Sequence, residues 1–127
     1  MSNSRLYQFS YTYETKTVKI YAKISIGASG APTLVTNANK GIVSIAKTAT
    51  GKYTLVLKDN FNRLLNASMT SLNSTPSTAP TLTVAADNSN LVTSPNIQIT
   101  TSLSGTAANP ASGEVILLEL TMKDSSV

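Results

Sequence analysis

The sequence predicts an all-β protein, built as one domain over residues 1–127 in the form of a β-sandwich or a small barrel. Apolar residues recur at period two through nearly every apolar segment, the pattern of strands that bury one face. Turn residues interrupt this pattern about every ten residues, a spacing typical of sandwiches and barrels. Hydrophobic residues make up 41% of the chain, which together with the patterning argues against disorder in its Ser- and Thr-rich second half.

The first expected strand spans residues 6–13 and carries an aromatic row. The row consists of Tyr7, Phe9, Tyr11 and Tyr13. Tyrosine is favoured where one end of a side chain is dry and the other wet, so we single out this row as a candidate subunit interface on a strand or arm that projects from the domain. A row in the protein core, a stacking surface for single-stranded bases and a sugar-binding surface are the alternatives.

The rest of the first half predicts a long strand, a short strand and a hairpin. In the long strand, Val18, Ile20, Ala22, Ile24 and Ile26 form an inward row, and the lysines between them point outward. A Gly- and Pro-containing break over 27–32 ends it, a short strand over 33–36 follows, and residues 37–41 form a turn. Residues 42–48 and 52–58 are the arms of a hairpin around Ala49-Thr50-Gly51, where glycine suits a positive φ.

One short helical turn is expected between Phe61 and Leu65. Asp59 is a good N-cap residue, and Phe61, Leu64 and Leu65 have the i, i+3, i+4 spacing of one helix face. We expect this turn to plug an open end of the β structure.

The second half predicts four further strands, over residues 67–72, 81–86, 97–103 and 114–123. The last is the clearest. Its inward row is Ile116, Leu118, Leu120 and Met122, and its outward row is Glu119, Thr121 and Lys123.

The residue inventory excludes several kinds of chemistry. The chain has no Cys and no His, which removes the usual zinc ligands, cysteine nucleophiles and histidine bases. Glu114 and Glu119 are five positions apart in one strand and point to opposite faces, so they cannot act as a catalytic pair. Asp87-Asn88-Ser89-Asn90 lacks the acidic spacing of a calcium loop and predicts an Asx-type turn. We therefore expect no enzymatic activity, no metal and no cofactor.

Charge is unevenly distributed along the chain. Residues 1–63 carry nine Lys and Arg against two acidic residues, whereas residues 64–127 carry one Lys against four acidic residues. A basic half can attract nucleic acid, but lysine also protects solvent-facing strand edges, and we favour that interpretation. No apolar run approaches a membrane span and no signal-peptide core follows Met1, so we expect synthesis in a cytoplasm and no membrane partner.

Two stretches carry a family resemblance. The first reads Gly51-Lys52-Tyr53-Thr54-Leu55-Val56-Leu57-Lys58-Asp59 and leads into Phe61, Leu64-Leu65 and Ala67; the second runs from Pro110 to Leu120 and ends in Lys123-Asp124-Ser125-Ser126-Val127. Together they resemble small virion proteins of tailed bacteriophages, including capsid decoration (cement) proteins. The resemblance covers about half the chain and contains no active-site motif.

This resemblance implies a structural protein on the capsid surface of a virion, synthesised in the host cytoplasm. Its partner would be the lattice of the major capsid protein, and it would act as a small homo-oligomer. The low charge content and the aromatic strand over residues 6–13, as an exposed sheet edge or arm, also indicate self-association, with a trimer favoured. Charged residues make up only 13% of the chain, against about a quarter in an average globular protein, which fits a surface partly covered by partners. The alternative is a non-enzymatic binding module for single-stranded nucleic acid or glycan.

Overall fold

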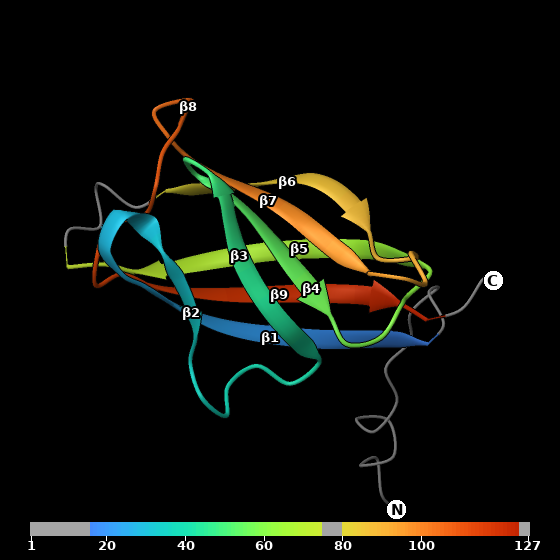
Figure 1. The fold of residues 1–127 in the computed structure, drawn as a ribbon. Coiled ribbons are helices and arrows are strands. Elements are labelled where there is room, and N and C mark those ends of the chain that lie inside the picture. The colour runs from blue at the N-terminus through green and yellow to red at the C-terminus, as the bar shows by residue number, and fades with distance from the viewer. Residues whose placement is uncertain (1–15, 75–79, 125–127) are drawn as a thin grey trace, which may run out of the picture.

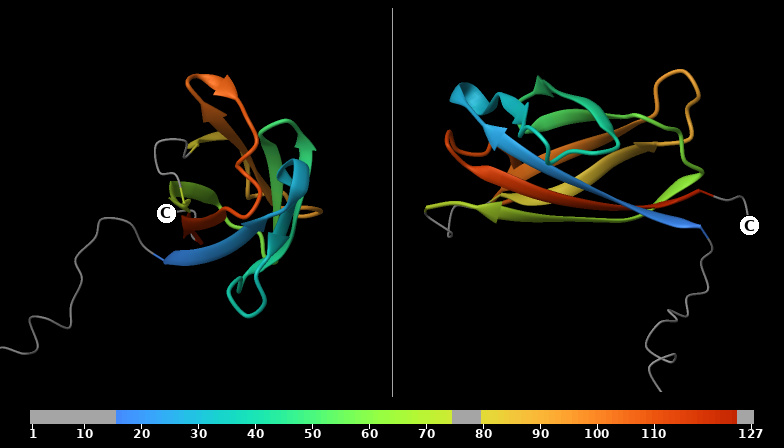
Figure 2. Two further views of the ribbon diagram at one scale, coloured as in Figure 1. Left: turned by 90° about the vertical axis from the view of Figure 1, so that its left-hand side faces the viewer. Right: turned by 90° about the horizontal axis from the view of Figure 1, so that it is seen from below.

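Two antiparallel β-sheets pack face to face in the computed structural model, which describes residues 16–74 and 80–124. One sheet has the order β2-β1-β9-β5, and the other has the order β3-β4-β7-β6 with the short β8 paired to β7 (Figure 1). The strands are β1 (Thr17–Ile26), β2 (Pro32–Leu34), β3 (Ile42–Ala49), β4 (Lys52–Leu57), β5 (Arg63–Leu72), β6 (Thr81–Asn88), β7 (Asn96–Leu103), β8 (Thr106–Ala107) and β9 (Val115–Lys123). The views in Figure 2 show the two layers from other sides. The predicted all-β sandwich is confirmed.

The core lies between the central strands of the two sheets. The first sheet contributes Ile20, Ala22, Ile24 and Ile26 from β1, and Ile116, Leu118, Leu120 and Met122 from β9. The second sheet contributes Tyr53, Leu55 and Leu57 from β4, with Ile97 and Ile99 from β7. Because alternate residues of each strand point to opposite faces, the other side of each of these strands is left for solvent or a partner.

The expected faces of β1 and β9 are confirmed with two exceptions. Val18, which was expected in the buried row, is 37% exposed because it lies at the beginning of β1, near the end of the sandwich. Lys123, which was expected to face solvent, is only 8% exposed. It lies at the end of the central strand β9, in register with Thr17 on one side and Arg63 on the other, so neighbouring strands flank its aliphatic stem.

The hairpin of β3 and β4 is confirmed, and its turn is tied to the rest of the molecule. Gly51 has φ +67°, and its N–H donates to Asn109 Oδ1 at 2.8 Å. The Thr101 N–H donates to the Gly51 carbonyl at 2.7 Å. Asn109 also donates through Nδ2 to the Ser29 carbonyl at 3.3 Å, so this one side chain joins the hairpin turn to the turn that follows β1.

The helical turn expected at Phe61–Leu65 is wrong. Phe61 donates its N–H to the Ser89 carbonyl and Asn62 donates to the Lys123 carbonyl, at 2.9 and 2.8 Å, so these groups are bound to other segments and not to a helical turn. Residues from Arg63 onward belong to β5. A register shift between Leu64 and Asn66 leaves Leu65 as the extra residue of a β-bulge. Phe61 does join the core, as expected of a plug.

The only helical element among the described residues is a short 3-10 turn, Ala28–Gly30. It lies within the segment 27–32, which was expected only to end the preceding strand. The short strand expected at 33–36 is β2, Pro32–Leu34, and the expected turn at 37–41 is present. Strands β5 and β6 extend beyond their expected ranges of 67–72 and 81–86. The expected strand over 6–13 lies outside the described residues. Nowhere in residues 16–74 and 80–124 is there a helix with the length and hydropathy of a membrane span.

Candidate interaction surface

The aromatic row predicted as an interface, Tyr7, Phe9, Tyr11 and Tyr13, lies outside the described residues. The described part of the chain offers a different candidate, the outer face of β1, β9 and β5. This outer face is the side of the four-stranded sheet that points away from the core.

Register and alternation together determine which side chains share the outer face. Tyr21 of β1 is in register with Glu119 of β9, which is in register with Ser68 of β5. The next row towards the end of β1 is Lys23, Leu117 and Thr70, followed by Ser25, Val115 and Leu72. Each row runs straight across three hydrogen-bonded strands, so the side chains form a continuous surface.

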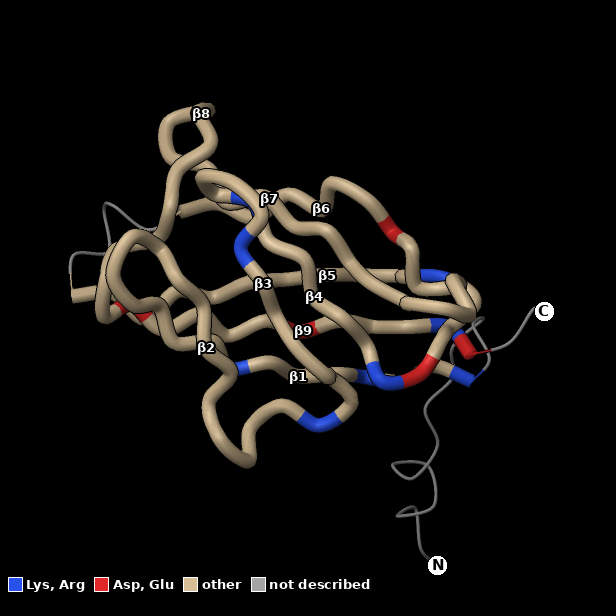
Figure 3. The backbone as a smooth tube through the Cα atoms, viewed as in Figure 1, with Lys and Arg blue, Asp and Glu red and all other residues tan. Residues whose placement is uncertain are grey.

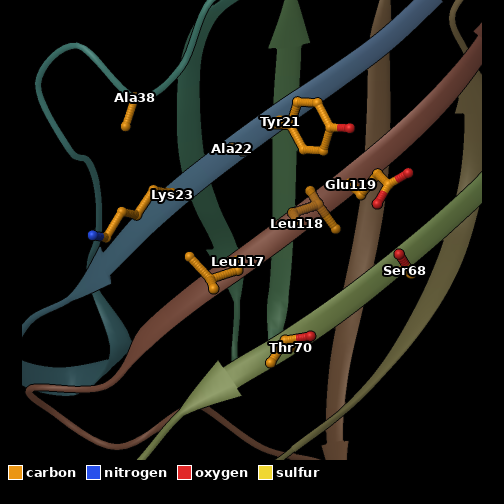
Figure 4. Close-up of a pocket in the computed structure, with 9 residues that line it drawn as sticks. All are labelled: Tyr21, Ala22, Lys23, Ala38, Ser68, Thr70, Leu117, Leu118 and Glu119. Atoms are coloured by element: carbon orange, nitrogen blue, oxygen red, sulfur yellow. The ribbon is translucent and has the colours of Figure 1, made fainter.

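Three large apolar side chains of this face are open to solvent. Tyr21 is 56% exposed, Leu72 is 51% exposed and Leu117 is 36% exposed. Figure 4 shows Tyr21 and Leu117 on neighbouring strands, with Lys23 and Glu119 to either side and Thr70 and Ser68 beyond them. The face therefore mixes an aromatic ring and aliphatic groups with charges of both signs, a composition suited to contact with another macromolecule.

Two shallow hollows flank Tyr21. One has a volume of about 260 Å³ and is lined by Tyr21, Ala22, Lys23, Ala38, Ser68, Thr70, Leu117, Leu118 and Glu119. The other, about 290 Å³, is lined by Lys19, Tyr21, Asn37, Ala38 and Lys40. Ala38 belongs to the loop after β2 and contributes to both. Small-molecule sites bury most of the ligand in a cleft of roughly 300–1,000 Å³, whereas these hollows are open dips in a sheet surface.

One ion pair lies on the outer face. Lys19 Nζ donates to Glu119 Oε1 at 3.0 Å. The hydrogen bond to Glu119, then the charges of Glu119 and Tyr21, raise the pKa of Lys19 above its ordinary value. Lys19 is well exposed, so water and salt screen the pair and its main effect is to orient the two side chains beside Tyr21.

The basic residues of the described part of the first half are divided between both sheets and the loops (Figure 3). Lys19 and Lys23 are in β1, whereas Lys47 and Lys52 are in β3 and β4 of the other sheet. Lys47 Nζ donates to the Ser29 carbonyl at 2.5 Å, so this lysine also holds a turn. This distribution is that of charges on solvated strands, the interpretation favoured from the sequence.

The carboxylates of the described part of the chain lie apart from one another. Glu114 and Glu119 point to different sides of the sheet, as predicted: Glu119 lies on the outer face, and Glu114 is 3% exposed and accepts a hydrogen bond from Asn73 Nδ2. Within residues 16–74 and 80–124, no three Asp or Glu side chains come together as metal ligands.

Asp87 forms the predicted Asx-type turn. Its Oδ1 accepts the Ser89 N–H at 3.0 Å, and its Oδ2 accepts the Leu64 N–H at 2.8 Å. Burial raises the pKa of Asp87, but the Ser89 hydroxyl and these two N–H groups outweigh that effect and hold it below its ordinary value. Asp87 thus links β6 to the beginning of β5, which is a structural role.

The sequence did contain a signal for Tyr21 that the aromatic row obscured. Tyr21 alternates with buried residues of β1 and falls between Lys19 and Lys23, so it stands on the face that the lysines mark as exposed. Leu117 gives the same signal in β9, where it lies between the inward residues Ile116 and Leu118. Large apolar residues in the polar rows of neighbouring strands can form a contiguous exposed patch, and such a patch is what marks an interaction surface.

Comparison of the chain with protein-family models, with curated proteins and with solved structures gave no match. The outer face and the sequence resemblance are therefore the two lines of evidence from which a function is argued.

Proposed function

We propose that this protein is a structural virion protein of a tailed bacteriophage, a capsid decoration (cement) protein that binds the lattice of the major capsid protein. The observation that carries the proposal is the outer face, where Tyr21, Leu117 and Leu72 are exposed across three adjacent strands. A broad, shallow, partly apolar surface supports attachment to another protein surface better than capture of a small molecule.

Two further properties support this role. The sandwich is compact without any cysteine, so it can fold and be stored unattached in a reducing compartment. Its surface carries few charges for its size, which fits a protein that is partly covered after assembly. We propose the capsid, among protein lattices, because the sequence resembles virion proteins of tailed bacteriophages.

A second function, binding of single-stranded nucleic acid, is favoured by one arrangement. Tyr21 lies between Lys19 and Lys23 in the sequence and shares the outer face with them, and aromatic rings on a basic sheet can stack bases. Glu119 pairs with Lys19 on this face and opposes phosphate binding, so we place this function second. The same arrangement is the basis for a glycan-binding module, for which the chain has no Trp to supply a stacking platform.

The deciding experiment mixes the purified chain with undecorated capsids of the virus that encodes it, and separately with single-stranded DNA, each at low and moderate salt. We expect capsid attachment that survives moderate salt, because apolar anchors are insensitive to salt, and negligible binding of DNA. Phosphate contacts would instead make DNA affinity fall steeply as salt rises. Tight, salt-sensitive DNA binding without capsid attachment would overturn the proposal in favour of the second function.

Matched variants locate the attachment site. Tyr21→Ser and Leu117→Ser should each weaken capsid binding by about tenfold or more, the effect of removing a central apolar anchor. Val43→Ser is the control, because Val43 is 62% exposed but belongs to β3 of the other sheet. Equal loss in all three variants, or loss in Val43→Ser alone, would contradict attachment through the outer face.

A further inference from the structure

A polar hollow lies at the end of the sandwich where β5 ends and β9 begins (Figure 1). Its volume is about 230 Å³, and the described residues that line it are Asn73, Ser74, Ala111, Ser112, Gly113 and Glu114. Glu114 is the one charged residue in this lining. It is two residues before the core residue Ile116 and shares its inward side, so the hollow is distinct from the outer face.

Hydrogen bonds hold the backbone of Glu114 in place. Its carbonyl accepts the Ile26 N–H at 2.9 Å, which continues the pairing of β9 with β1. Its N–H donates to the Ala111 carbonyl at 3.1 Å and closes a turn in which Gly113 has φ +87°. Ser112 and Gly113 are exposed in this turn and line the hollow beside Glu114.

The two oxygens of the Glu114 carboxylate differ in their surroundings. Oε1 accepts a hydrogen bond from Asn73 Nδ2. Oε2 is buried and accepts no hydrogen bond from the described residues. Because the residue is only 3% exposed, water solvates this carboxylate poorly, and a buried carboxylate without a partner is costly.

This end of the sandwich has acceptors but lacks a countercharge. No lysine or arginine within residues 16–74 and 80–124 forms an ion pair with Glu114. Burial, and then the charge of Glu114, raises the pKa of Tyr53, so that charge acts on the core. Ser71 is in register with Ile116, and its buried Oγ is a second polar atom to which the described residues offer no hydrogen bond.

We propose that the hollow binds an ammonium group, carried either by a small primary amine or by a lysine side chain of a partner protein. An ammonium is a compact cation with three donors. Because the terminal torsion of glutamate is broad, a small rotation of Glu114 presents Oε2 to a cation in the hollow. This binding does not depend on whether the protein attaches to a capsid.

Other cations fit the hollow less well. A guanidinium binds best to both oxygens of a carboxylate, and Asn73 already occupies one of them. A calcium ion takes six to eight oxygen ligands, whereas the lining described here contains a single carboxylate.

Titration of the isotope-labelled full chain with n-butylammonium tests the proposal, with n-butanol at the same ionic strength as the uncharged control. We expect n-butylammonium to shift the amide signals of Asn73, Ser112 and Gly113 saturably, and n-butanol to leave them unchanged. Glu114→Gln keeps the shape of the side chain and should weaken binding by about tenfold or more, because a charge-assisted hydrogen bond is lost. Glu119→Gln is the matched control on the outer face and should bind like the wild type.

A blocked Gly-Lys-Gly peptide identifies the source of the ammonium group. Binding about tenfold or more tighter than that of n-butylammonium assigns the site to a lysine of a partner protein, and equal or weaker binding assigns it to a small amine.

Four results would overturn the proposal. These are no saturable shift with n-butylammonium, equal shifts with n-butanol, unchanged binding in Glu114→Gln, and shifts of the same amides by calcium chloride but not by the amine. The comparison of n-butylammonium with n-butanol uses the unmodified chain, so it decides the question even if Glu114→Gln does not fold.

Discussion

Gly51 lies where the β3–β4 turn comes closest to the segment after β8. A Cβ atom at this position would lie 2.6 Å from the Thr101 carbonyl oxygen and 2.7 Å from the Ala108 backbone nitrogen. Both neighbours are backbone atoms and cannot rotate away. We therefore expect Gly51→Ala to lower the free energy of unfolding by about 2–4 kcal/mol, from steric overlap and positive φ together.

Gly105 provides the matched control for that prediction. It has φ +80°, but a Cβ there would meet nothing within 4 Å. Gly105→Ala should therefore show only the conformational effect, about 1–2 kcal/mol. Chemical denaturation of the two variants measures the difference, and equal destabilisation would show that the close approach at Gly51 is not tight.

Asp87 gives the fold a dependence on pH. Burial raises its pKa in the folded protein, but the Ser89 side chain and the N–H groups of Leu64 and Ser89 outweigh burial and hold the pKa below the ordinary value of 3.8. A depressed pKa stabilises the fold above the ordinary value, and this contribution disappears as the pH falls through 3.8 towards the folded pKa. Asp87→Asn should be less stable by about 0.5–1.5 kcal/mol at neutral pH, because one N–H loses its acceptor.

Denaturation of both proteins across the acid range tests the role of Asp87. The difference in stability should shrink as the pH falls below 3.8, where the wild-type carboxyl also becomes neutral. A difference that stays constant with pH would contradict the assigned role of the carboxylate charge.

At the scale of elements, adjacent residues of β9 belong to opposite faces of the sheet. Leu118 is 2% exposed in the core, and its neighbour Leu117 is on the outer face. Leu118→Asp should unfold the protein, because a buried carboxylate there would have no partner. Leu117→Asp adds the same charge one residue away and should leave the fold intact. Circular dichroism and thermal melting separate the two, and a wild-type melt for Leu118→Asp would mean that the assigned face of β9 is wrong.

Period-two patterning predicted β1, β4 and β9 well because each strand buries one uninterrupted row against the other sheet. The same reasoning failed at β5, where the bulge at Leu65 changes the phase of the alternation. Leu64 faces inward before the bulge, and Ala67 and Met69 do so after it. Local spacing cannot distinguish that change of phase from a helical turn, because the partner that enforces it, β9, lies far away in the sequence.

The candidate surface was predictable only in part for a related reason. Alternation shows that Tyr21 and Leu117 point outward, but their proximity depends on β1 and β9 being neighbours in one sheet. Nothing local in the sequence specifies that pairing. The aromatic row at residues 7–13 was predicted as the interface instead, because its residues are close together in the sequence.

At the scale of the whole molecule we predict self-association, with a trimer favoured. The low charge content and the exposed apolar groups of the outer face support it. Light scattering over a range of concentrations should show a mass near three times 13.3 kDa. A monomer at high concentration, both free in solution and in the presence of capsids, would contradict the prediction.

The pairing of β1 with β9 has a consequence for folding during synthesis on the ribosome. Roughly ninety residues separate the two strands, so before β9 has left the ribosome only Ile24, Ser25 and Ile26 of β1 can pair within their own sheet, with β2. At about 5–20 residues per second, that wait lasts roughly 5–20 s. During this time the β1 edge that pairs with β9 is open to chaperones and to other nascent chains. The hairpin of β3 and β4 can form earlier, so the second sheet can begin to assemble before the first.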